Sequence, residues 1–108
     1  MPHDPRLAER MRSALARRAG IAERAMFGGY CWMLNGNMLC GVEVGRFMFR
    51  VGKEQEAEAL ARPGSSPIVL SGRTMRGFVW VDETRCRGRG LEAWIDLATR
   101  FVQALPPK

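Results

Sequence analysis

The sequence is poor in the residues that most often carry chemistry. It has one histidine, His3, and its three cysteines include no CxxC pair among 108 residues. A structural zinc site needs closely spaced cysteine and histidine ligands, so we expect no metal and no cofactor. An odd number of cysteines also argues against the disulfide framework of a small secreted protein. The serines of the predicted turns, Ser65, Ser66 and Ser71, have no base nearby in sequence, so we expect no enzyme.

Long apolar runs are absent as well. The longest uncharged apolar stretches have the length of a strand, far short of the ~20 residues that a membrane-spanning helix needs. Residues 1–18 carry charges throughout and have no apolar segment of the kind found in signal peptides, so we expect a cytoplasmic protein. The length and a hydrophobic content of 46% predict a single folded domain over residues 1–108.

The charge of the chain is unbalanced. Lysine and arginine number 17 against 11 acidic residues, which gives a formal net charge of +6, and only two of the 17 are lysines. An excess of positive charge is compatible with nucleic acid or with an acidic partner. No run of basic residues is as long as a basic tail, so a solvated surface rich in arginine is the simpler explanation.

A hairpin signal organises the middle of the chain. Asn35-Gly36 favours a two-residue type I′ turn, and a strand-like alternation flanks it on both sides. Counting outward from that turn places Cys31 opposite Cys40. A second tight turn at residues 45–46 then adds a third strand, so residues 26–52 should form a three-stranded meander.

Alternation along this meander predicts two faces of different character. The first is almost wholly apolar and should be the core face beneath the helices: Cys31, Met33, Met38, Cys40, Val42, Val44, Phe47, Phe49 and Val51. The second is mixed: Tyr30, Trp32, Leu34, Leu39, Glu43, Met48 and Arg50.

Helix and strand signals account for the rest of the chain. We expect a helix over residues 5–20, a connection over 21–25, a short helix over 53–62, strands over 67–70 and 75–81, and a helix over 91–105. Asp4-Pro5 is a typical helix start, and Pro63-Gly64 and Pro106-Pro107 are typical stops. The order α-β-β-β-α-β-β-α predicts a two-layer α+β fold, with an antiparallel five-stranded sheet and helices on one face.

Four segments resemble the TfoX N-terminal domain family: MFGGYCWMLNGNMLCGV, FRVG, TMRGFVWVD and LEAWIDLATRFVQALPPK, which span residues 26–108. The resemblance implies the same order of helices and strands. Full-length members regulate competence for DNA uptake and carry a second, C-terminal helical domain, for which these 108 residues show no counterpart. Arg50 stands where many members have lysine, which keeps the charge but changes its geometry. The resemblance implies no catalytic residue, so we expect a small binding or regulatory module.

The first candidate site is an aromatic and basic surface on the mixed face, extended by the second hairpin. Its residues are Tyr30, Trp32, Met48, Arg50, Arg76, Phe78 and Trp80. Because tryptophan, tyrosine, methionine and arginine anchor many protein interfaces, we expect a homodimer or another protein partner. Two alternatives stay open: the chain's own loops cover the rings, or single-stranded nucleic acid stacks on them while the arginines hold phosphates.

The second candidate is the pair Cys31 and Cys40. At a non-hydrogen-bonded position of an antiparallel pair, opposed α-carbons lie ~4.5 Å apart, within the range of a disulfide. A thiol redox pair is therefore one hypothesis. Two small buried hydrophobes that stay reduced are the alternative that we favour.

The third candidate is the loop before the last helix, where Arg85, Arg87 and Arg89 alternate with other residues. Arginines together with free backbone N–H groups at the start of a helix can bind an anion. We expect Cys86 in this loop to be exposed and the most reactive of the three thiols.

Overall fold

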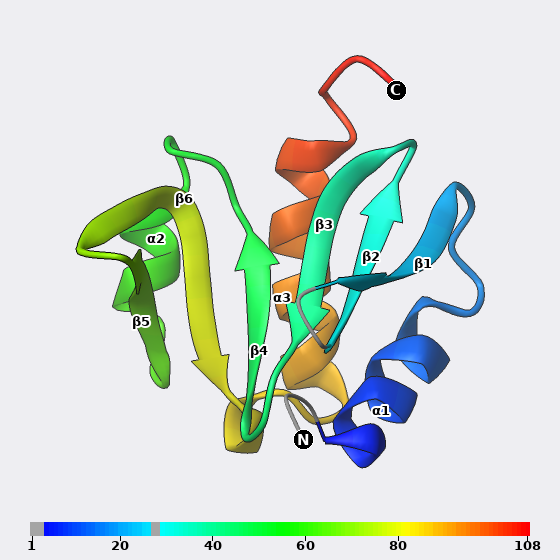
Figure 1. Ribbon diagram of the computed structural model, residues 1–108, viewed down its shortest axis with the longest axis horizontal. Helices are drawn as coiled ribbons and strands as arrows, with labels where there is room; N and C mark the ends of the chain where they lie inside the picture. Colours follow the sequence, from blue (N-terminus) through cyan, green and yellow to red (C-terminus); the bar gives the residue numbers. More distant parts are fainter. Residues whose placement is uncertain (1–3, 27–28) are drawn as a thin grey trace.

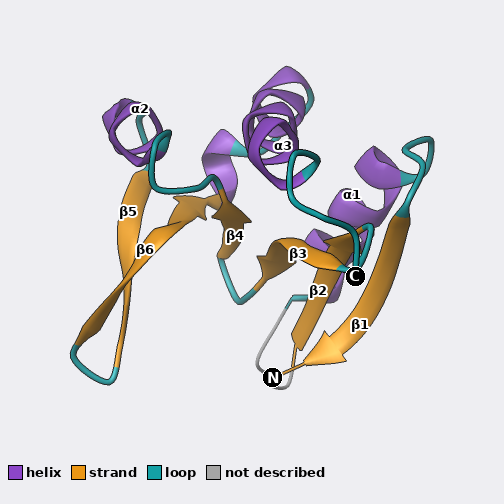
Figure 2. Ribbon diagram, turned by 90° about the horizontal axis from the view of Figure 1, so that it is seen from above, coloured by secondary structure: helices purple, strands orange, loops and turns teal. Residues whose placement is uncertain are grey.

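The computed structural model describes residues 4–26 and 29–108, in which three α-helices cover one face of a six-stranded antiparallel sheet (Figures 1 and 2). In chain order the elements are α1 (Pro5–Leu15), β1 (Ile21–Met26), β2 (Gly29–Leu34), β3 (Asn37–Val42), β4 (Arg46–Arg50), α2 (Glu56–Ala61), β5 (Ser65–Leu70), β6 (Arg73–Asp82), the 3-10 helix η1 (Glu83–Arg85) and α3 (Arg89–Val102). The strands are ordered β1-β2-β3-β4-β6-β5. The α+β class, the antiparallel sheet and the helices on one face are confirmed, whereas the prediction of five strands was wrong.

The sixth strand is β1, in the segment that we expected to be a connection. It pairs with β2 along its whole length, from Ile21 opposite Leu34 onward. Its pattern is not that of a half-buried strand because Glu23 occupies a position on the helix side. There the Glu23 carboxylate accepts hydrogen bonds from Arg12 and from the indole of Trp32. A charged residue on the helix side removes the alternation by which a strand is recognised.

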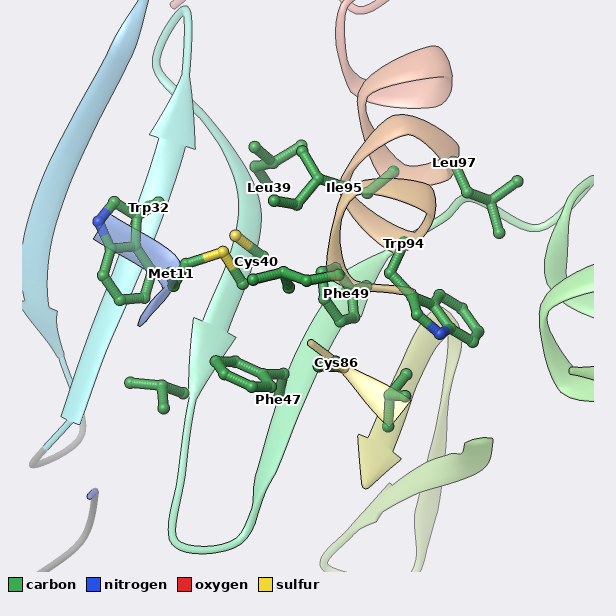
Figure 3. Close-up of a cluster of buried hydrophobic side chains, with 14 of the residues drawn as sticks. Met11, Trp32, Leu39, Cys40, Phe47, Phe49, Cys86, Trp94, Ile95 and Leu97 are labelled. Carbon is green, nitrogen blue, oxygen red and sulfur yellow. The ribbon is translucent and has the colours of Figure 1, made fainter. Parts of the chain in front are cut away.

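A β-bulge in β3 decides which side chains reach the core. Beside the turn the register is the predicted one, as far as Met33 opposite Met38. Beyond it Trp32 lies opposite Cys40, so Leu39 is an extra residue in β3. A bulge turns two successive side chains toward the same side of a sheet. Leu39 and Cys40 accordingly both point into the core, and both are fully buried (Figure 3).

The bulge exchanges the two faces predicted for β2. Trp32 and Leu34 pack in the core, where Trp32 is only 1% exposed, and Cys31 lies opposite Gly41 rather than Cys40. The predictions that Cys31, Met33 and Met38 lie on the core face were therefore wrong. Five of the predicted core residues are confirmed: Cys40, Val42, Phe47, Phe49 and Val51.

The turn between β3 and β4 lies one residue earlier than expected. The N–H of Glu43 donates to the carbonyl of Arg46, so the two central residues are Val44 and Gly45. Gly45 takes a φ of +78°, a conformation that glycine adopts without strain. Val42 consequently pairs with Phe47, and Val44 is 58% exposed at the tip of the turn instead of buried in the core.

Helix α3 packs behind β3 and β4 and closes the centre of the core (Figure 1). Its apolar stripe is buried from Leu91 to Val102, and the Trp94 ring stacks on Phe49 with centroids 5.6 Å apart (Figure 3). Asp4 caps α1 as predicted, because its carboxylate accepts the Arg6 N–H at 2.9 Å. The outer faces of the strands remain free of helices (Figure 2).

Candidate functional site

The helix-free face of the sheet carries one continuous row of side chains. Hydrogen-bonded neighbours place one residue of each strand in this row, from β1 at one edge to β5 at the other: Arg24, Cys31, Gly41, Met48, Trp80 and Ser66. We call these six residues the cross-strand row. The sequence predicted two of them, Met48 and Trp80, as members of a contact surface.

The centre of the cross-strand row is closely packed. A Cβ built on Gly41 would lie 3.3 Å from the Sγ of Cys31 and 3.3 Å from the terminal methyl of Met48, so these two side chains cover the glycine. Beside them, the guanidinium of Arg46 lies 3.8 Å from the centroid of the Trp80 ring. Arg46 also pairs with the Glu43 carboxylate. The middle of the row, from Cys31 to Trp80, is therefore an ordered and apolar surface, and the exposed Arg24 and Ser66 flank it.

Trp32 and Tyr30 do not belong to this surface. Trp32 is buried in the core, and its predicted role as a contact residue was wrong because the bulge turns it toward the helices. Tyr30 also lies on the helix side, packed against the core, with the Arg12 guanidinium carbon 5.9 Å from its ring centroid.

The other three predicted contact residues, Arg50, Arg76 and Phe78, lie close together beside a hollow of about 620 Å³. Arg50 is opposite Phe78 across β4 and β6. The sequence did not predict that the end of α3 would complete this hollow with Arg100 and Phe101. Arg100 and Phe101 lie far along the chain from Arg50, so only the tertiary fold brings them here.

Two glycines form the base of the hollow. Gly52 has a φ of +81° and Gly77 a φ of +84°, and the N–H groups of Val51 and Gly52 both donate to the carbonyl of Gly77, at 2.8 and 3.0 Å. A Cβ on Gly77 would lie 3.1 Å from the carbonyl carbon of Gly52, and a Cβ on Gly52 would clash with the ring of Phe101. Glycine thus allows the backbone to touch both the neighbouring strand and the aromatic ring.

Glu56 connects the backbone of Gly77 to the side chain of Arg76 at the rim of the hollow. Its carboxylate accepts the Gly77 N–H at 2.8 Å and the Arg76 Nε–H at 2.7 Å. These interactions, the backbone hydrogen bond first, hold the pKa of Glu56 below its usual value. Arg76 is therefore fixed at the edge of the hollow by an ionised partner at neutral pH.

Cys31 and Cys40 do not lie opposite each other as predicted, so the geometry proposed for a redox pair is absent. Cys31 lies on the helix-free face and Cys40 in the core, because the bulge takes them out of opposition. All three cysteines are free thiols, and burial raises the pKa of each. The expectation that Cys86 is exposed was also wrong: it is fully buried, and its pKa is raised to about 12.

The basic loop contains short helical structure and internal hydrogen bonds. Arg85 ends η1, Arg89 begins α3, and Arg87 lies 4.0 Å from the Glu83 carboxylate. Two backbone N–H groups here already have partners within the loop, since Cys86 donates to Glu83 and Gly90 donates to Arg87. These two N–H groups are therefore not free to bind an anion, and the anion site of Arg85, Arg87 and Arg89 stays a prediction.

Within residues 4–26 and 29–108, no group of three or more histidine, cysteine, aspartate or glutamate side chains could hold a metal ion. His3 lies outside the described residues. No helix in the described part of the chain is long and apolar enough to cross a membrane.

Comparison with known proteins gives one match. The family model of the TfoX N-terminal domain matches residues 13–102, which is most of the chain. No curated protein and no solved structure matches the sequence.

Proposed function

The chain belongs to the TfoX N-terminal domain family, and from that premise we propose that it is a non-catalytic, cytoplasmic binding and regulatory module that acts by pairing with a second copy of itself. The proposed contact surface is the helix-free face of the sheet. The observation that carries the proposal is the composition of the cross-strand row.

The row is complementary to itself. A two-fold axis that lies between two such faces, parallel to the strands, reverses the row, as in any isologous interface. The reversed row places Trp80 over Cys31, Met48 over Gly41 and Arg24 over Ser66. Each large side chain then meets a small one, and no two charges of the same sign meet along the row.

The dimensions of the molecule suit such a contact. A stable interface buries about 800 Å² on each partner. The principal extents of the chain are 33, 30 and 29 Å, and the sheet runs across the whole body (Figure 1). A face-to-face contact over the six strands therefore supplies the necessary area.

The net charge of +6 works against self-association. Salt screens the repulsion between two copies of the chain, so the dimer should become tighter as ionic strength rises. Binding of nucleic acid, the second candidate function, has the opposite dependence, because salt competes with phosphate contacts. Salt dependence therefore separates the two functions.

Sedimentation velocity tests the proposal. The wild-type chain should form a concentration-dependent dimer, and Met48→Glu should remain monomeric because it places a charge at the centre of the row. Val44→Glu is the matched control, since Val44 is exposed in the turn between β3 and β4, outside the row. A wild-type chain that stays monomeric at every concentration, or a Met48→Glu variant that dimerises as well as the control, would overturn the proposal.

A further inference from the structure

We propose that the hollow between β4, β6 and the end of α3 binds a phosphate monoester attached to a flat ring, a ligand of the nucleoside monophosphate class. This goes beyond self-association and uses none of the residues of the cross-strand row. It rests on how the cations of the hollow are held, on their number and on the rings beside them.

The two central arginines of the hollow are positioned by uncharged groups. The guanidinium carbon of Arg50 lies 5.6 Å from the ring centroids of both Phe78 and Phe101. Arg100 donates to the side-chain oxygen of Gln55 at 3.2 Å. These contacts fix the direction of each guanidinium without neutralising its charge.

Gln55 is itself firmly held. Its amide nitrogen donates to the carbonyls of Val51 and Leu97, both at 2.9 Å, which leaves its oxygen directed at Arg100. A flexible arginine loses rotamer entropy when it is ordered in this way. An ordered but uncompensated guanidinium is the arrangement that binds a carboxylate or phosphate through paired hydrogen bonds.

Some of the arginines elsewhere on the molecule are neutralised by carboxylates. Several form ion pairs with carboxylates at 3.4 Å or less: Arg6, Arg12, Arg18, Arg46 and Arg62. In the described part of the chain, no ion pair involves Arg50, Lys53 or Arg100. Arg50, Lys53 and Arg100 therefore lie together around one hollow without an ion pair.

The charge of the hollow matches a phosphate monoester. Its lining has three arginines and Lys53 against one acidic side chain, Glu54. Glu56 neutralises Arg76 from outside the lining, and the carboxyl end of α3 contributes about half a negative charge. An excess of about one and a half positive charges remains, close to the −1.5 to −2 of a phosphate monoester at neutral pH. A carboxylate would leave part of this charge without a partner.

The remaining lining suits a flat apolar group. Phe78, Phe101, Ala104 and Leu105 contribute apolar surface beside the cations. A volume of about 620 Å³ is typical of small-molecule sites. Gly52 lies directly against the Phe101 ring, so the ring packs on the backbone at the edge of the hollow. A ring attached to the phosphate can pack here while Arg50 and Arg100 bind the phosphate oxygens.

Calorimetric titration tests the assignment with four probes: adenosine 5′-monophosphate, adenosine, inorganic phosphate and a single-stranded oligonucleotide. We expect the monophosphate to bind best, phosphate alone to bind more weakly, and adenosine not to bind. Arg50→Ala should weaken monophosphate binding by about tenfold or more, since a hydrogen-bonded ion contact is lost. Arg73→Ala, an exposed arginine of β6 away from the hollow, should bind like the wild type.

Lys53→Ala is a second variant in case Arg50→Ala fails to fold, because Lys53 is exposed in the loop before α2. It should also weaken binding of the monophosphate. Equal affinity in Arg50→Ala, Lys53→Ala and Arg73→Ala would overturn the assignment, as would binding of adenosine as tight as that of its phosphate. An oligonucleotide that binds more tightly than the monophosphate, and loses that affinity in Arg50→Ala, would overturn it in favour of a nucleic-acid strand.

Discussion

The indole N–H of Trp32 donates to the carboxylate of Glu23 at 3.2 Å, across the pair formed by β2 and β1. The same carboxylate accepts two hydrogen bonds from Arg12 of α1, at 2.8 and 3.0 Å. One acidic residue on the helix side of an edge strand therefore satisfies a core indole and ties the first helix to the sheet. It also explains why this strand does not resemble one in sequence.

Replacing Glu23 by alanine should destabilise the fold by about 1–3 kcal/mol, because it leaves the buried indole N–H of Trp32 without an acceptor. Glu23→Gln should cost less, since an amide oxygen can still accept. Glu9→Ala is the control: Glu9 also pairs with Arg12, but its side chain is 66% exposed, so its loss should matter little. Urea unfolding measures all three, and equal losses for Glu23→Ala and Glu9→Ala would contradict the structure.

Glu23 should also make the fold sensitive to acid. The hydrogen bond from Arg12, more than any other contact, holds the pKa of Glu23 below its ordinary value of 4.5. A carboxyl with a lowered pKa binds fewer protons in the folded state, so its stabilisation is complete above pH 4.5 and is lost as the pH falls through the folded value. The urea midpoint of the wild type should fall further between pH 5 and pH 3 than that of Glu23→Gln. If the urea midpoints of the two proteins fall equally, other carboxyls account for the loss of stability in acid.

The bulge in β3 makes a sharp distinction between adjacent residues. Leu39 is fully buried, so Leu39→Ala should cost about 2–5 kcal/mol. Met38 lies on the helix-free face and is only partly buried, so Met38→Ala should cost clearly less. A strand without the bulge reverses this order, because Met38 then points into the core. Chemical denaturation of the two variants therefore measures the register directly.

The sequence predicted the Asn35-Gly36 turn, the helices and the buried face of β4, because turn chemistry and periodicity act over a few residues. The bulge could not be predicted in this way. The residues around Leu39 alternate equally well in either register, and the choice is made by the fit of Trp32 beneath the helices. The hollow could not be predicted either, because it is formed by residues that are far apart in the sequence. Arg50 and Phe78 belonged to the predicted surface, but Phe101 reaches them only through the packing of α3.

Gly52 should tolerate no side chain. Its φ of +81° is unfavourable for any residue with a side chain. An added Cβ would also clash with the Phe101 ring. Gly45→Ala is the matched control, because Gly45 has a similar φ of +78° but nothing within 4 Å of an added Cβ. Both variants should lose about 1–2 kcal/mol for the left-handed backbone. Gly52→Ala should lose more, and the difference between the two thermal midpoints measures the contact with Phe101. Equal midpoints would place the ring elsewhere.

The three thiols should react slowly in the native protein and in a definite order. Cys40 and Cys86 are fully buried, and burial raises the pKa of both, so little thiolate is present to react. Cys31 is 7% exposed on the helix-free face, and burial raises its pKa too, but it should still react first. At a concentration low enough to keep the chain monomeric, because the proposed dimer covers Cys31, a disulfide-exchange reagent at pH 8 should modify this thiol slowly and the other two only in denaturant.

Two variants decide the order of thiol reactivity. Cys31→Ser should remove the slow native phase, whereas Cys86→Ser should leave it unchanged. Oxidation of the native protein should form no Cys31–Cys40 disulfide, because the two side chains lie on opposite faces of the sheet. A fast native phase that is lost in Cys86→Ser would instead mean that the segment before α3 opens and exposes its thiol. Such opening would need the Arg10 guanidinium to release the carbonyls of Glu83 and Cys86, which it now binds at 3.3 and 3.1 Å. An Arg10→Ala variant should therefore speed the reaction of Cys86 and leave that of Cys31 as it was.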